Sequence, residues 1–261
     1  MVCFFGVIYR KAFGGVILIL KILFCLCLVL EAVFTPWYLK ALWPQKCFKS
    51  LVLKMICATL FVLIGVLSVF IAGNTSQYAI MMLVGLAFGW VGDYFLHAKP
   101  SNTYFAIGFT SFLIGHLVYI AAYVKTLPKL FPDYKQFNLI EFSAGTVIII
   151  ISFAIAIFAI KMKFNPKPVK YAVMLYAVII TVMFLKASAL GIKYYLSGVE
   201  GGIYAALVLT VGSFFFVLSD ASLAVILFGG KGKSYPLKIF NIVTYFWGQV
   251  MLASSILFIN S

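Results

Sequence analysis

The strongest constraint in this sequence is a series of eight apolar runs, each long enough to cross a bilayer as one α-helix. A spanning helix needs about 20 mostly apolar residues, because each helical residue rises only ~1.5 Å. Pro, Gly and Asn residues in the breaks are typical of helix ends and turns. The runs cover residues 13–34, 50–72, 79–97, 103–125, 138–160, 169–190, 203–228 and 236–259. We therefore predict an all-α, polytopic membrane helix bundle, with residues 1–261 forming a single integral membrane domain.

Composition excludes the main alternatives to this fold class. With 65% hydrophobic and 10% charged residues, the chain has too little polar side chain to cover a soluble fold. A membrane barrel is disfavoured because the runs do not alternate apolar and polar residues. The first run contains Lys21 and follows Arg10-Lys11, so its alternative is a signal sequence over residues 12–30. No A-x-A cleavage site follows that stretch, and we predict a membrane helix.

The basic residues predict an orientation in the membrane. Lys and Arg number 20 against 6 acidic residues, and most lie between the apolar runs. Six lie on one side of the predicted bundle, namely Arg10, Lys11, Lys125, Lys129, Lys135 and Lys193. Ten lie on the other side, namely Lys40, Lys46, Lys49, Lys99, Lys161, Lys163, Lys167, Lys231, Lys233 and Lys238. The positive-inside rule predicts that the loops at 40–49, 161–168 and 231–238 are cytoplasmic and both termini are not.

Ionisable side chains inside the runs are candidate functional residues, because each costs a few kcal/mol or more to place there. They are Asp93, His116, Asp220 and Lys54. Aspartate is too short to reach the interface, so Asp93 and Asp220 need water or a polar partner. The alternative for each is a helix–helix tether or an ion pair, and Lys54 has the further alternative of reaching the interface with its long side chain.

Other charged groups near the runs have simpler interpretations. We expect Lys186 to extend to the interface. His97 stands at a helix end, where we expect solvent around it. Glu31 is near the end of the first run and is expected to be interfacial.

Helical periodicity aligns polar residues into stripes on three of the predicted helices. One stripe holds Gly108, Phe112, His116, Tyr119 and Tyr123, a second Ser213 and Asp220, and a third Asn241, Tyr245 and Gln249. We predict one wet cavity that opens on the lysine-rich side, with the two aspartates near its mouth. Interhelical hydrogen bonding alone is the alternative. The expected substrate-binding residues are Lys54, Tyr119, Ser213, Tyr245 and Gln249, and the expected catalytic residues are Asp93, Asp220 and His116.

Two carboxylates in a poorly hydrated pocket cannot both ionise easily, so one can act as an acid while the other stays charged. That pair suits acid-assisted hydrolysis through a cationic intermediate, a proton-coupled carrier, or an aspartyl protease. A zinc hydrolase is disfavoured because the chain has only 2 histidines and its 5 cysteines form no C-x-x-C pair. There is no G-x-S-x-G elbow and no Gly-rich phosphate loop. We predict free thiols, no metal site and no cofactor.

Several of these segments, in this order and spacing, resemble the YhhN-like lysoplasmalogenase family of eight-helix membrane proteins. The resemblance covers roughly residues 45 to 255. It rests on Gly85 to Asp93, Ala106-Ile107-Gly108 through Gly115-His116-Leu117-Val118-Tyr119, Tyr176 with Met183, Gly212-Ser213 through Leu218-Ser219-Asp220-Ala221, and Asn241 through Tyr245-Phe246-Trp247-Gly248-Gln249. One departure is Lys54-Met55, where the family has Lys-Pro.

The resemblance implies hydrolysis of the vinyl-ether bond of lysoplasmalogens to a fatty aldehyde and glycerophosphoethanolamine or glycerophosphocholine. By position it carries over Lys54, Asp93, His116, Asp220 and Gln249 as the matched polar residues. The implied partners are a lysophospholipid substrate and membrane lipid, with no nucleic acid and no cofactor. We expect an endoplasmic reticulum membrane location. The alternatives are an intramembrane aspartyl protease, for which no Tyr-Asp or Pro-Ala-Leu segment is present, and a non-enzymatic lipid or proton-coupled carrier.

Overall fold

The computed structural model describes residues 2–73, 75–136, 138–159, 161, 163 and 168–259, with side chains omitted for 2–14, 158–159 and 168. These residues form an all-α bundle without strands. Its helices are α1 (Val2–Leu42), α2 (Phe48–Ala72), α3 (Gln77–Ala98), α4 (Asn102–Leu130), α5 (Leu139–Ala154), α6 (Pro168–Leu196), α7 (Gly202–Phe228) and α8 (Tyr235–Ser254). A π-helical turn, Ile155–Ala159, continues α5, and a 3₁₀ turn, Ser255–Leu257, continues α8.

Among the described residues, each of the eight helices, α5 together with its π-helical turn, supplies a segment long and apolar enough to cross a bilayer, which confirms the predicted polytopic fold. Several helices run further than the sequence predicted. The helix α1 continues through Pro36 to Leu42, and α6 continues through Gly191 to Leu196. At Gly191 the reason is packing, because a Cβ there would lie 2.9 Å from the backbone of Ala206 in α7. That glycine lets two helices approach closely and does not end one.

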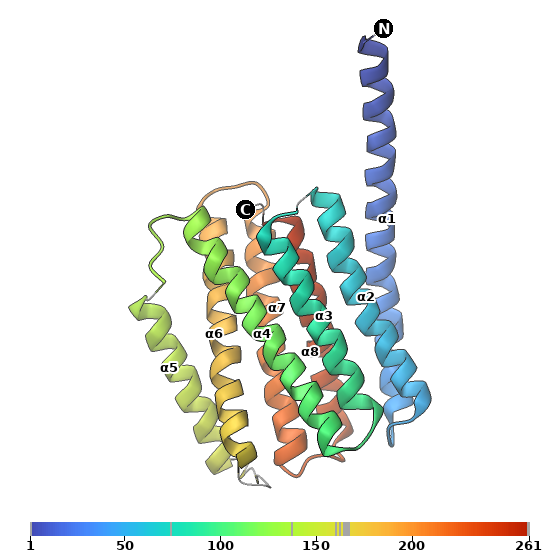
Figure 1. The fold of residues 1–261 in the computed structure, drawn as a ribbon. Coiled ribbons are helices and arrows are strands. Elements are labelled where there is room, and N and C mark those ends of the chain that lie inside the picture. Colours follow the sequence, from blue (N-terminus) through green and yellow to red (C-terminus); the bar gives the residue numbers. More distant parts are fainter. Residues whose placement is uncertain are drawn as a thin grey trace.

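The helix α8 lies at the centre of the bundle and α5 at its edge (Figure 1). In Figure 1, α8 is surrounded by α2, α3 and α7. Of the residues in the most apolar part of α8, 67% are buried. In the most apolar part of α5 only 6% of the residues are buried, because α5 packs mainly against α6. The N-terminal part of α1 extends beyond the other helices (Figure 1). Side chains that point from the neighbouring helices toward α8 therefore meet in the interior.

The connections that carry most of the loop lysines lie at one end of the bundle, the lower end in Figure 1. They join α1 to α2, α3 to α4, α5 to α6 and α7 to α8. The backbone N–H of Lys163 donates to the carbonyl of Phe228 at 2.8 Å, so Lys163, between α5 and α6, meets the end of α7. The predicted grouping of these loops on one side is confirmed for the described residues, and Lys167 lies outside them. Which membrane face this end occupies stays a prediction.

Two expectations about charged groups are wrong, and a third group has a partner that the sequence did not indicate. Glu31 is fully buried and accepts a hydrogen bond from Thr35 at 3.2 Å, because α1 continues to Leu42 and α2 covers this face. His97 is only 5% exposed, because α1 and α2 close over the end of α3. Lys186 extends to the α4–α5 connection, where Glu141 in the first turn of α5 pairs with it at 2.8 Å, and its depth in the membrane stays a prediction. Tertiary packing supplied a partner for each group where the sequence suggested water or lipid head groups.

Candidate functional site

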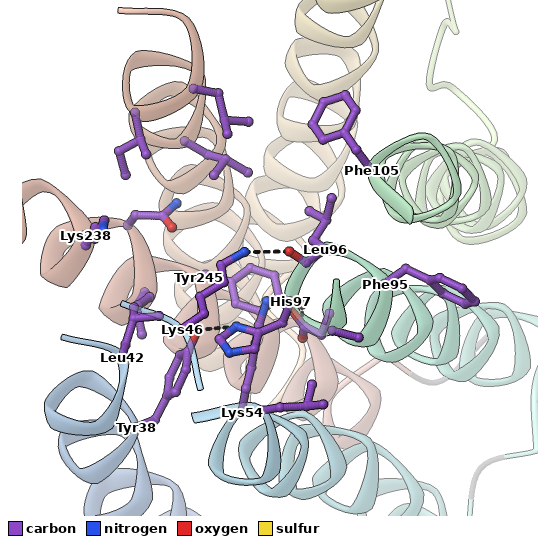
Figure 2. A pocket seen from close by; sticks show the side chains of 18 of the residues that line it. Tyr38, Leu42, Lys46, Lys54, Phe95, Leu96, His97, Phe105, Lys238 and Tyr245 are labelled. Carbon is purple, nitrogen blue, oxygen red and sulfur yellow. Dashed lines mark hydrogen bonds and ion pairs between the residues drawn. The ribbon is translucent and has the colours of Figure 1, made fainter. Parts of the chain in front are cut away.

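A cavity of about 930 Å³ opens at the lysine-rich end of the bundle. Six helices line it with polar or aromatic side chains, namely α1, α2, α3, α4, α7 and α8, and α4 contributes only phenylalanines. Its interior holds Lys54, Asp93, Asp220, Asn241 and Tyr245. Its mouth carries Lys46, His97, Lys99 and Lys238, several of which are drawn in Figure 2. A cavity is therefore present at the predicted end, and Phe112, Asp220, Asn241 and Tyr245 are the members of the polar stripes that line it.

Asp93, on α3, is held by two donors from different helices. Its Oδ1 lies 2.9 Å from the Lys54 ammonium on α2, and its Oδ2 accepts a 2.7 Å hydrogen bond from the Tyr245 hydroxyl on α8. The side chain is 1% exposed. Edge-to-face contacts with Phe61, Phe112 and Phe216 fix the Tyr245 ring. This environment fits an ionised carboxylate, which accepts hydrogen bonds at both oxygens.

Asp220, on α7, has a different environment. Its Oδ2 accepts a 2.7 Å hydrogen bond from the Tyr176 hydroxyl on α6 and lies 3.3 Å from His116 Nε2 on α4. His116 Nε2 is also 2.8 Å from the Tyr176 oxygen, so the three groups form a closed triangle. The other oxygen, Oδ1, has no hydrogen-bond partner among the described residues, and the side chain is 14% exposed to the cavity. Asp220 therefore has a free oxygen where Asp93 has none.

A comparison with protein-family models matches residues 16–256 to the YhhN family. The chain belongs to the YhhN family. Comparisons with curated proteins and with solved structures give no significant match. The match extends the resemblance found in the sequence to include most of α1, whose Tyr38 and Leu42 line the cavity.

The remaining predicted site residues of this YhhN protein divide into two groups. Gln249 and Tyr119 lie behind the cavity wall, where the Tyr119 hydroxyl donates to Gln249 Oε1 at 3.1 Å and Gln249 Nε2 donates to the Tyr245 oxygen at 3.3 Å. They steady Tyr245 and do not line the cavity. Ser213 is fully buried and donates to the carbonyl of Leu209 on its own helix at 2.5 Å, away from the cavity.

Two glycines that precede Asp93 on α3, Gly85 and Gly89, leave space for the side chains of Tyr119 and Gln249. A Cβ on Gly89 would lie 2.6 Å from Gln249 Nε2, and one on Gly85 would overlap the Tyr119 ring. The G-x-x-x-G spacing places both glycines on one face of the helix. The motif in this YhhN chain therefore lets Tyr119 and Gln249 approach α3 directly behind Tyr245.

Sequence reasoning missed a polar cluster beside the cavity mouth. His97 Nε2 lies 2.8 Å from the Ser50 hydroxyl, and its Nδ1 lies 3.4 Å from the Tyr38 hydroxyl. These side chains join α1, α2 and α3 at the mouth, where Tyr38 and His97 line the cavity. The sequence signal for this cluster was weak, because Tyr38 and Ser50 are distant in the chain and both are ordinary at a membrane interface.

The described residues contain no group of three or more His, Cys, Asp and Glu side chains able to hold a metal ion. Cys25, Cys27, Cys47 and Cys57 are free thiols. The chemistry available at the cavity consists of two differently partnered carboxylates, one buried lysine, phenols and a histidine.

Proposed function

We propose that this protein hydrolyses the vinyl-ether bond of lysoplasmalogens, releasing a fatty aldehyde and glycerophosphoethanolamine or glycerophosphocholine. The observation that carries the proposal is the pair of carboxylates, Asp93 and Asp220, which line one cavity in different environments. The resemblance to lysoplasmalogenases supports the substrate class. The proposal includes an endoplasmic reticulum location, which imaging of a tagged full-length chain tests.

Asp220 is the proton donor in this scheme. Vinyl-ether hydrolysis begins when a proton is added to the outer alkene carbon, which leaves an oxocarbenium ion at the carbon bonded to oxygen. Asp220 has a free Oδ1 that faces the cavity, while Tyr176 and His116 orient Oδ2. A neutral Asp220 can therefore present its proton to the alkene without breaking either contact.

Asp93 is the fixed negative charge in this scheme. Lys54 and Tyr245 hold its two oxygens, and the ionised form stabilises the positive oxocarbenium ion that forms nearby. Water then adds to the oxocarbenium carbon and returns a proton to the Asp220 carboxylate. The hemiacetal that results breaks its carbon–oxygen bond to the glycerol, which leaves as an alcohol, and the aldehyde is the other product. One water is consumed and no electrons are transferred.

The cavity suits a single-chain amphiphile. Lysines surround its mouth, whereas Phe105, Phe112, Leu223 and Ile242 contribute apolar wall. Its volume of about 930 Å³ is within the usual range for small-molecule sites. A lysophospholipid can keep its head group at the mouth while the alkenyl bond enters between the aspartates.

The test is aldehyde release by the purified chain in detergent, with a vinyl-ether lysophospholipid and no added metal. The matched control is the saturated 1-O-alkyl lysophospholipid, which has the same shape but no alkene to protonate. We expect aldehyde from the vinyl ether alone. Cleavage of an acyl lysolipid with the vinyl ether left intact would contradict the reaction class, and movement of unchanged lipid across a vesicle would indicate a carrier.

A further inference from the structure

The cavity mouth carries more positive charge than its carboxylates balance. Lys46, Lys54, Lys99 and Lys238 line the cavity together with Asp93 and Asp220. Lys54 is matched by Asp93 at 2.9 Å. No carboxylate of the described residues lies within ion-pair distance of Lys46, Lys99 or Lys238. An uncompensated group of cations at an opening attracts an anion.

Lys46 is directed across the mouth. It lies in the connection between α1 and α2, and its ammonium donates to the carbonyl of Leu96 near the end of α3 at 2.7 Å (Figure 2). Partial burial, with Lys54 and Lys238 as cationic neighbours, lowers the pKa of Lys46 to about 8. The ammonium has three protons, so two remain available for a ligand. A nearby anion would relieve the repulsion among these lysines.

Lys238 faces the mouth from α8. Its ammonium lies 5.4 Å from the centre of the Trp43 ring, and the Trp43 ring lies 4.8 Å from the Tyr235 ring, tilted by 43°. These contacts hold the lysine at this end of the bundle without neutralising it. Figure 2 shows Lys238 and Lys46 among the side chains that line the same pocket. Both ammonium groups therefore reach the entrance from different elements.

We propose that Lys46 and Lys238 form a phosphodiester subsite that binds the head group of a single-chain glycerophospholipid. The inference rests on the proposed function for the identity of the lipid, and it assigns the phosphate to lysines other than Lys54, which the sequence predicted to bind substrate. Lys54 forms an ion pair with Asp93 deeper in the cavity, so its positive charge is already neutralised. Lysine binds a phosphate as a point charge and needs no bidentate geometry.

The spacing along α8 agrees with this assignment. Lys238 precedes Tyr245 by seven residues, or roughly 10 Å of helix rise. Tyr245 contacts Asp93, so the phosphodiester subsite and the carboxylates are separated along the cavity axis. In a lysoplasmalogen the three-carbon glycerol unit separates the phosphodiester from the vinyl ether. A head group on Lys46 and Lys238 therefore directs the vinyl ether inward, toward Asp93 and Asp220.

The experiment measures equilibrium binding and not turnover. The full chain, in uncharged maltoside micelles, is given saturated 1-O-alkyl glycerophosphoethanolamine or the 1-O-alkyl glycerol of the same chain length. We expect Lys46→Gln and Lys238→Gln each to weaken phospholipid binding about tenfold, because each removes one charge-assisted contact. Binding of the neutral alkylglycerol should change less than twofold, which also shows that the cavity is intact.

The controls separate charge from structure. Lys193→Gln, at the opposite end of the bundle, should leave both affinities unchanged, and Lys46→Arg with Lys238→Arg should restore phospholipid binding. The wild-type affinity for the phospholipid should be full below about pH 8 and fall at higher pH, because the bound anion favours the protonated form of Lys46. Lys46→Gln should flatten that dependence. The titratable groups that face Lys46 are Lys54 on α2, Lys238 on α8 and His97 on α3.

A competition arm distinguishes a lipid head group from free phosphate. Soluble glycerophosphoethanolamine and inorganic phosphate are each added against the alkyl phospholipid. Competition by glycerophosphoethanolamine alone identifies a head-group site, and competition by both compounds identifies a general phosphate site. Either result supports the subsite if the competition is lost in the double variant Lys46→Gln with Lys238→Gln. Competition that survives in that variant, or equal loss of both lipids, would overturn the proposal. Wild-type binding without aldehyde release from the vinyl ether would instead refute the proposed function while the subsite stands.

Discussion

Two buried lysine–carboxylate pairs stand at opposite ends of the bundle and have almost the same geometry. Lys54 and Asp93 are 2.9 Å apart at the lysine-rich end, and Lys186 and Glu141 are 2.8 Å apart near the α4–α5 connection. Both consist of residues that are costly inside a membrane. Distance and charge alone therefore do not distinguish them.

Their surroundings do distinguish them. Lys186 also donates to the Tyr134 hydroxyl at 2.9 Å and the Gln136 carbonyl at 2.8 Å, so its three protons are all used. Lys54 and Asp93 instead line a cavity that a second carboxylate shares. The pair at Lys186 fixes α5 and the α4–α5 connection to α6. The pair at Lys54 instead lies in the wall of the cavity. We therefore use the cavity and the unpaired oxygen of Asp220, and not the ion pair itself, as the ground for proposing a site at Lys54 and Asp93.

The largest effect is expected for Asp220→Asn. The amide keeps the shape of the side chain but cannot donate a carboxylic proton, so turnover should fall ~10²–10⁴-fold. Folding, checked by size-exclusion chromatography, should be unchanged. Ser213→Ala, on the same helix and away from the cavity, is the matched control and should leave aldehyde release near normal. Near-normal turnover in Asp220→Asn would return this residue to the role of a helix–helix tether.

Asp93→Asn should lower turnover by at least ~100-fold, because it removes the negative charge that stabilises the oxocarbenium ion. The variant should still fold, since the freed Lys54 faces the cavity and can be hydrated there. The double variant Asp93→Asn with Asp220→Asn should be less than additive, because the two groups act as a unit. Aldehyde release per folded molecule decides this, and fully additive losses would show that the carboxylates act independently.

Smaller effects are expected for the groups that orient Asp220. Tyr176→Phe removes the 2.7 Å hydrogen bond to Asp220 and should lower kcat about tenfold, the value of one hydrogen bond. His116→Gln should cost less than either aspartate variant. Both should change kcat with little change in KM, because neither group lines the cavity. A change confined to KM would place these side chains in contact with the substrate.

At the other pair the expected effect is on stability and not on chemistry. Lys186→Met leaves Glu141 without its cation and should lower the free energy of unfolding by ~1–3 kcal/mol. Thermal unfolding measures this loss, and the partner change Glu141→Gln in the same chain should recover part of it. Aldehyde release per folded molecule should stay within twofold of the wild type. A selective loss of turnover would erase the distinction between the two pairs.

The mildest test alters neither pair and asks which membrane face the cavity end occupies. Cys47 is exposed in the α1–α2 connection, and the backbone N–H of Ser50 donates to its sulfur, which lowers the pKa of the thiol and aids labelling. In sealed vesicles an impermeant maleimide should reach Cys47 only from the cytoplasmic side, as the lysine distribution predicts. Labelling from the lumenal side would reverse the orientation and leave the fold unchanged.

The apolar runs, the family and the two aspartates were all accessible from the sequence. Run length is a local property, so eight spanning helices followed directly from it. The positions of Asp93 and Asp220 near the lysine-rich end followed from counting residues along each helix. Helix ends were less accessible, because Pro36 and Gly191 resemble stop signals and the bundle accommodates both inside helices.

Only the tertiary structure decided which polar groups meet. Helical periodicity gives the face of a residue on its own helix, but not which neighbour that face contacts. Lys54 therefore had no assigned partner until α2 packed beside α3, and Tyr176 gained its contact with Asp220 only when α6 packed beside α7. The burial of Glu31 and His97 and the meeting of Lys46 with Lys238 at one opening depend on the same packing. The sequence determined the helices and their charges, because those are local, and the packing around α8 decided which charges are paired and which face the cavity.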